Sequence, residues 1–140
     1  MAYAQTLTPR PGLGVPGTGA LIVLALGTIA LALTQGTAQG ALFLVGGLGV
    51  DTFRFFAAAD STLAASDMIV DFNPDQDVID LRALNVDFVG RGPLSGDGSV
   101  RWDHADGMTR ILVDLDGDRQ PDMLIRLNGR LHLDPDSFVL

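Results

Sequence analysis

The stretch that most constrains the fold of this chain is one complete nonapeptide of the form Gly-Gly-x-Gly-x-Asp-x-U-x, where U is a large apolar residue. Its glycines, Gly46, Gly47 and Gly49, permit the positive φ angles of tight turns and let carbonyl oxygens converge on one point. Asp51 adds a short carboxylate, and Phe53 adds an apolar side chain for a narrow core. Hard oxygen ligands suit calcium, so the nonapeptide predicts a turn of a calcium-binding β-roll. The alternative is a glycine-rich turn that leads into a strand.

The residues after the nonapeptide follow an order that is more informative than the nonapeptide alone. Asp60-Ser61 comes first, Asp-Met-Ile-Val-Asp-Phe follows over residues 67–72, and Asp-Val-Ile-Asp-Leu follows over residues 77–81. This order resembles the C-terminal domain of the serralysin-type RTX (repeats-in-toxin) secreted proteins, and the resemblance covers roughly residues 46–140.

The resemblance implies an all-β fold in which the end of a calcium β-roll runs into a small β-sandwich. It also implies that Asp60 and Asp67 help to close the last calcium sites. Together with the nonapeptide, the expected ligands at the end of the roll are Gly47, Gly49, Asp51, Asp60 and Asp67.

The charge distribution favours divalent cations as ligands. All 17 acidic residues are aspartates and all nine cations are arginines; residues 51–136 hold the 17 aspartates against eight arginines, a net charge of −9. Such a segment is unsuited to nucleic acid, which needs clustered basic residues. Aspartates are also good turn formers, which is the alternative explanation. The chain has no cysteine and so no disulfide bond, which leaves calcium as a means of stabilising an extracellular fold.

At 140 residues the chain has room for one domain with a real core, and we expect it at residues 41–140. Residues 1–40 form a separate segment, in which residues 1–19 are rich in Pro and Gly and predict a loop or disorder. Residues 20–33 are a 14-residue apolar run. As a helix this run would span about 21 Å, short of a membrane core of about 30 Å. The run predicts a hydrophobic helix (a membrane anchor over residues 20–34 or an uncleaved signal), a degenerate roll without calcium ligands, or an incorrectly assigned gene start or frame.

The C-terminal part reads as short strands separated by turn residues, which predicts a β-sandwich. Asp106-Gly107 and Asn128-Gly129 are strong hairpin signals. Strands are expected at residues 52–56, 67–72, 78–81, 86–89, 100–104, 109–115, 123–127 and, as a last extended piece, 136–140.

A second candidate cation site lies in the loop between two of these strands. Its carboxylates, spaced around a glycine, are Asp114, Asp116, Asp118 and Asp122. The spacing departs from the EF-hand loop, which ends in a Glu. An acidic β-turn without an ion is the alternative.

The sequence predicts no catalysis. The family that it resembles contains zinc proteases with His-Glu-x-x-His, whereas this chain has no Glu and its histidines, His104 and His132, lie 28 residues apart. We expect His104 on a strand face beside Trp102.

The last five residues, Asp136, Ser137, Phe138, Val139 and Leu140, carry the final expectation. The resemblance implies that they belong to an uncleaved signal read by the type I (ABC) secretion machinery, and they could equally form an edge strand. The leading hypothesis is therefore a non-catalytic, extracellular calcium-binding module carrying a type I export signal. The alternatives are a small membrane-anchored protein with an acidic outer β domain and a calcium-dependent adhesion module.

Overall fold

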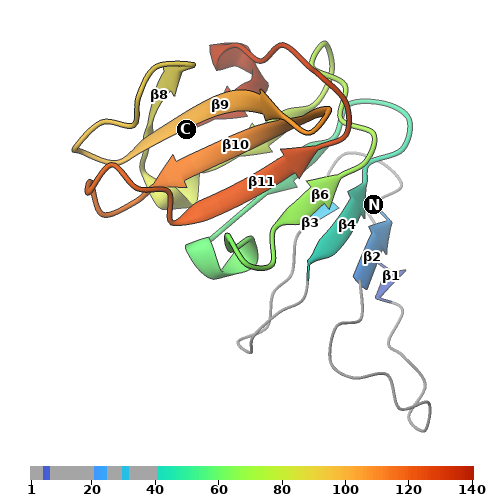
Figure 1. The fold of residues 1–140 in the computed structure, drawn as a ribbon. Coiled ribbons are helices and arrows are strands. Elements are labelled where there is room, and N and C mark those ends of the chain that lie inside the picture. Colours follow the sequence, from blue (N-terminus) through green and yellow to red (C-terminus); the bar gives the residue numbers. More distant parts are fainter. Residues whose placement is uncertain (1–4, 7–20, 25–29, 32–40) are drawn as a thin grey trace, which may run out of the picture.

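The computed structural model describes residues 5–6, 21–24, 30–31 and 41–140, and it describes side chains for residues 41–140. The described chain consists of β-strands with three single-turn 3-10 helices, η1 (Ala58–Asp60), η2 (Arg82–Leu84) and η3 (Pro135–Ser137) (Figure 1). The all-β prediction is confirmed.

The strands form two sheets. In order across the larger sheet they are β1 (Gln5–Thr6), β2 (Leu21–Leu24), β4 (Leu42–Val45), β6 (Asp67–Ile69), β11 (Met123–Leu127), β10 (Met108–Asp114), β9 (Ser99–Ala105) and β8 (Asp87–Gly90). The smaller sheet contains β12 (Phe138–Val139), β7 (Val78–Asp80), β5 (Thr52–Arg54) and β3 (Ala30–Leu31).

The strands from β2 to β7 alternate between the two sheets and pair in parallel within each one, which is the path of a β-roll. Leu44 lies opposite Ile69, 25 residues farther along, and Phe53 lies opposite Ile79, 26 residues farther along. Each turn of the roll therefore brings its two loops next to the loops of the neighbouring turn, which is how carboxylates from different turns meet.

The roll continues directly into an antiparallel meander. Strand β11 pairs in parallel with β6 and antiparallel with β10, and β10 pairs antiparallel with β9, so these strands extend the larger sheet (Figure 1). The β9–β10 turn has positive φ at both Asp106 (53°) and Gly107 (78°), as a tight hairpin turn requires. The predicted hairpin at this dipeptide is confirmed.

The core lies between the two sheets and is filled by the inward side of each strand. Phe53 and Phe55 are fully buried, and the rings of Phe53 and Phe72 are 6.0 Å apart. Trp102 is 2% exposed. All four aromatic residues belong to the core, and the core position expected for Phe53 is confirmed.

The hydrophobic run near the N-terminus contains strands where it is described. Leu21–Leu24 pairs in parallel with β4, and Ala30–Leu31 pairs in parallel with β5. For these residues the helix prediction is wrong, and the degenerate-roll interpretation fits them. No helix in the described part of the chain is long and apolar enough to cross a membrane. The loop predicted for residues 1–19 lies, apart from β1, outside the described residues.

Candidate metal sites

The loop that joins β4 to β5 holds the nonapeptide at one edge of the roll. Gly47 and Gly49 have φ angles of 92° and 110°, which only glycine adopts readily. The Asp71 carboxylate, in the next turn, accepts hydrogen bonds from the backbone N–H groups of Gly46 (2.9 Å) and Gly47 (2.8 Å). Asp77 accepts from the N–H of Asp51 at 2.9 Å. The carboxylates of Asp71 and Asp77, which both belong to the next turn of the roll, thus hold the glycine loop through its backbone N–H groups.

The carboxylate of Asp51 is fully buried, and neither of its oxygens has a hydrogen-bond donor among the described residues. It folds back over Gly46, where an added Cβ would lie 2.6 Å from Oδ2, so a side chain at residue 46 would displace it. Burial raises the pKa of Asp51, and the charges of Asp77 and Asp71 raise it further. A buried carboxylate without a donor is costly unless a cation or a proton compensates it.

Asp67 lies at the opposite edge of the roll, at the start of β6. It is fully buried; its Oδ1 accepts a hydrogen bond of 2.9 Å from the N–H of Leu42, and its Oδ2 has no donor in the described part of the chain. Asp60, in η1, is 6% exposed and accepts from the N–H groups of Phe56 (2.6 Å) and Ala57 (3.1 Å). Two acidic side chains therefore share this buried edge.

The pKa of Asp67 reports this environment. Burial, the largest cause, and the charge of Asp60 raise it, whereas the Leu42 hydrogen bond and the charge of Arg126 lower it; the result is a pKa of about 7. A divalent ion beside Oδ2 would lower the pKa of Asp67, because the ion favours the charged carboxylate.

The five residues expected together at the end of the roll are thus divided between its two edges. Gly47, Gly49 and Asp51 belong to the β4–β5 loop, whereas Asp60 lies within the β5–β6 connection and Asp67 begins β6. Asp71 and Asp77, which accept the hydrogen bonds of the glycine loop, stand in the motifs that carry the family resemblance, but the sequence predicts no role for them. The sequence signal that could have identified them is their position in the motifs Asp-x-Ile-x-Asp-Phe and Asp-x-Ile-Asp-Leu.

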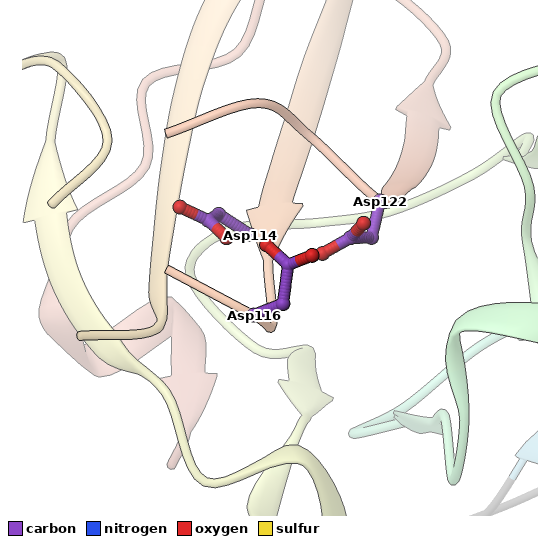
Figure 2. A group of neighbouring side chains, drawn as sticks. All are labelled: Asp114, Asp116 and Asp122. Atoms are coloured by element: carbon purple, nitrogen blue, oxygen red, sulfur yellow. The ribbon is translucent and has the colours of Figure 1, made fainter. Parts of the chain in front are cut away.

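The loop between β10 and β11 gathers three of its four predicted carboxylates. One oxygen from each of Asp114, Asp116 and Asp122 lies within 4.8 Å of the others, and the Asp116 and Asp122 carboxylates point toward one another (Figure 2). Asp118 is exposed and is not part of this group.

The same loop is also held by its own hydrogen bonds. Asp114 accepts from the N–H groups of Gly117 and Arg119 at 2.8 Å each, and Asp122 accepts from the N–H of Leu115 at 2.7 Å. Asx-type bonds of this kind stabilise an acidic turn without an ion. The geometry accommodates a cation but does not require one.

The C-terminal residues are part of the fold. Phe138 and Val139 form β12, which pairs with β7 at the edge of the smaller sheet, so the edge-strand expectation is confirmed. Ser137 is 1% exposed and donates to Asp134, whereas Asp136 and Leu140 are exposed. The interpretation of these five residues as an export signal stays a prediction.

The two histidines lie around Trp102. The ring centroids of His104 and His132 each lie 5.3 Å from the centroid of the Trp102 ring, in an edge-to-face arrangement. His104 Nε2 is 2.7 Å from the carbonyl oxygen of Leu131. The expectation that His104 lies beside Trp102 is confirmed.

Comparison with known proteins gives this arrangement a family. A family model described as peptidase M10 serralysin C terminal matches residues 5–139. Serralysin C of Dickeya chrysanthemi is 36% identical over 95 residues, which are 63% of this chain and 20% of that protein. Metalloprotease AprA of Pseudomonas entomophila is 36% identical over 88 residues, or 56% of this chain and 18% of that protein. The chain thus spans about a fifth of the curated relatives it matches.

Solved structures support the fold. The AlgE6R3 subunit of mannuronan C5-epimerase from Azotobacter vinelandii matches with a TM-score of 0.50 and 23% identity, over 87% of this chain and 74% of that one. At this identity the similarity supports the β-roll architecture alone.

Proposed function

This chain belongs to the peptidase M10 serralysin C-terminal family, and on that basis we propose that it is a non-catalytic, calcium-binding module of a secreted protein. The observation that carries the proposal is Asp67, a fully buried carboxylate whose Oδ2 has no donor among the described residues. Asp51 presents the same chemistry at the other edge of the roll. Hard oxygens left unpaired between roll turns are suited to calcium.

In this proposal calcium acts as a switch for folding. At low calcium, the buried carboxylates must be protonated or remain uncompensated, which lowers the stability of the roll. Extracellular calcium modules bind with dissociation constants of about 10⁻⁴ to 10⁻³ M. A site of about 10⁻⁴ M in about 1 mM calcium would stabilise the fold by about 1.4 kcal/mol. Two or three such sites would decide whether a marginally stable domain folds.

The proposed ligands are those expected from the sequence, now grouped by edge: Gly47, Gly49 and Asp51 at one edge, and Asp60 and Asp67 at the other. The β10–β11 loop is a third proposed site, with Asp114, Asp116 and Asp122 as ligands and Asp118 outside it.

Calcium titration of the purified chain tests the proposal. We expect isothermal titration calorimetry to detect binding heat, and the thermal unfolding temperature in 1 mM calcium to exceed that in chelator. Magnesium is the matched control ion, because its strict octahedral geometry at shorter distances suits a roll edge less well. The absence of both heat and a thermal shift with calcium would overturn the proposal.

We also propose that residues 136–140 carry a type I export signal and that the module is released to the outside of the cell. The support is the family membership, since the matched relatives are serralysins. Deleting residues 136–140 is expected to abolish release through a type I exporter. Ile125→Ala is the control, because Ile125 is fully buried and its truncation weakens the fold while leaving the C-terminal residues intact. Equal release of both variants would contradict the export role.

A further inference from the structure

We propose that a hollow on the smaller sheet binds a small organic carboxylate through Arg54, Arg82 and Phe56. The hollow is shallow and widely open to solvent, has a volume of about 390 Å³ and is lined by Arg54, Phe56, Asp80, Arg82 and Ala83. Arg54 and Asp80 alternate along their strands with the core residues Phe53 and Ile79, so the hollow lies on the side of the sheet away from the core. None of the lining residues is a proposed calcium ligand, although the backbone N–H of Phe56 donates a hydrogen bond of 2.6 Å to the proposed ligand Asp60.

Asp80 fixes the two arginines in place. It lies opposite Arg54 in the β5–β7 register, and its Oδ2 accepts from Arg54 Nε and from Arg82 Nη2 at 2.7 Å each. Its Oδ1 accepts from Arg82 Nε at 3.1 Å. Asp80 is only 1% exposed, so this anchor is buried. The arginine side chains are therefore ordered before a ligand arrives, which lowers the entropic cost of binding.

The guanidinium groups keep donors for a ligand. Arg54 uses Nε toward Asp80, and no hydrogen bond from its Nη atoms is found among the described residues; the same holds for Nη1 of Arg82. The side chains of Arg54 and Arg82 are 32% and 58% exposed. Two arginines against one aspartate leave a local charge of +1 on a strongly acidic domain. Planar N–H forks of this kind match a carboxylate.

Phe56 adds the second part of the specificity. Phe56 is half exposed (49%) and lines the hollow two residues after Arg54, just beyond the end of β5. Ala83 contributes only a methyl group, which leaves the space open. An apolar ring could pack on Phe56 while its carboxylate meets the arginines, so the ligand class is a small carboxylate with a flat apolar body. An inorganic anion would use the arginines alone.

Side-chain and backbone ¹⁵N NMR of the full chain in calcium tests this inference, with benzoate as the probe. Benzoate is expected to shift the Nε–H signals of Arg54 and Arg82 and the amide signals of Phe56 and Ala83 in a saturable way. Benzamide, which has the same ring and no charge, and inorganic phosphate are each expected to bind at least fivefold more weakly. If benzamide bound as tightly as benzoate, the arginines would not be recognising the carboxylate. If phosphate bound as tightly as benzoate, Phe56 would not contribute to binding. Either result overturns the proposal.

Two variants complete the test without breaking the Asp80 ion pairs. Ala83→Phe fills the hollow and is expected to weaken benzoate binding at least tenfold, and Phe56→Ala is expected to weaken it at least fivefold without changing phosphate binding. Leu63→Ala is the control, because Leu63 is another half-exposed apolar residue that does not line the hollow. Wild-type affinity for benzoate in Phe56→Ala, or in a folded Ala83→Phe, would contradict the proposal. The calcium concentration is the same in every titration, and melts with and without chelator report calcium binding separately.

Discussion

The backbone N–H of Leu42 donates a hydrogen bond of 2.9 Å to Oδ1 of Asp67, a residue 25 positions farther along the chain. This bond joins two successive turns of the roll through a buried carboxylate whose other oxygen, Oδ2, has no donor among the described residues. One carboxylate thus contributes a structural acceptor and an uncompensated charge at once. The two contributions can be separated, because an amide preserves the acceptor and removes the charge.

Asp67→Asn should be more stable than the wild type in chelator and should lose a large part of that advantage in calcium. In chelator at pH 8, the variant is expected to be more stable than the wild type by about 1–3 kcal/mol, because it removes a buried charge and keeps the Leu42 bond. In calcium, it should lose the stabilisation that the ion gives, about 1.4 kcal/mol for one site at tenfold excess over the dissociation constant. Urea denaturation in the two buffers measures both values. Asp87→Asn, on the exposed side of β8, is the control and should change neither.

The raised pKa of Asp67 predicts a specific pH dependence in chelator. Its pKa is about 7 in the folded state against 3.8 for the free side chain, so the folded state binds the proton more tightly. The resulting stabilisation is present below about pH 4 and is lost as the pH rises through about 7, by roughly 2–4 kcal/mol. The difference in unfolding free energy between the wild type and Asp67→Asn, measured from pH 5 to pH 8, isolates this group. A flat difference over that range would contradict the assignment.

Asp80 should show the opposite pH dependence. The hydrogen bond from Arg82, the largest cause, holds the pKa of Asp80 far below its usual range, with further help from Arg54. A lowered pKa gives stabilisation that is present above the unfolded value of about 4 and lost as the pH falls further. Asp80→Asn is expected to cost about 1–3 kcal/mol at pH 7, since both arginines are partly exposed. Urea denaturation at pH 7 and pH 3 should show this cost shrinking in acid; a constant cost would indicate a packing effect alone.

The sequence was sufficient to predict many local elements of the fold. The hairpin expected at Asn128-Gly129 is wrong, because the chain leaves β11 there and its next strand, β12, belongs to the smaller sheet. The hairpin at Asp106-Gly107 follows from residues that tolerate positive φ, and the alternation around Trp102 identifies the inward face of β9. Strand β11 has the predicted bounds, residues 123–127, whereas the strand expected at 67–72 ends at Ile69. These features depend on neighbours in sequence, which is why pattern reasoning reaches them.

Long-range register was not predictable in the same way. The nonapeptide indicates a roll, but loops of unequal length place Gly46 against Asp71 and Leu42 against Asp67. The sequence therefore predicts one group of ligands at the end of the roll, whereas in the structure these residues lie at two opposite edges of the roll. The helix prediction for the apolar run failed at Leu21–Leu24, because an uninterrupted apolar segment has no periodicity to distinguish a buried parallel strand from a helix.

Phe138 should be a stability determinant despite its position near the end of the chain. It is 6% exposed, its ring lies 5.3 Å from that of Phe88, and its strand pairs with β7. Truncation to Ala removes these contacts, and we expect a loss of about 2–4 kcal/mol in calcium. Urea denaturation measures the loss, with Leu140→Ala as the control because Leu140 is 43% exposed. Comparable effects of the two variants would mean that β12 is not anchored through Phe138.

The β10–β11 loop offers a matched pair of aspartates to decide whether it binds an ion. Asp116 and Asp118 are both exposed, and each accepts one hydrogen bond from a loop N–H, at 3.1 and 2.7 Å. Only Asp116 belongs to the carboxylate group with Asp114 and Asp122. If calcium binds there, Asp116→Asn should weaken that site at least tenfold while Asp118→Asn leaves it unchanged, because an amide is a poorer calcium ligand than a carboxylate. Calorimetric titration of the two variants measures the affinities. Equal effects, or none, would reduce the loop to an acidic turn held by its own backbone hydrogen bonds, and the calcium response would then belong to the roll edges at Asp51 and Asp67.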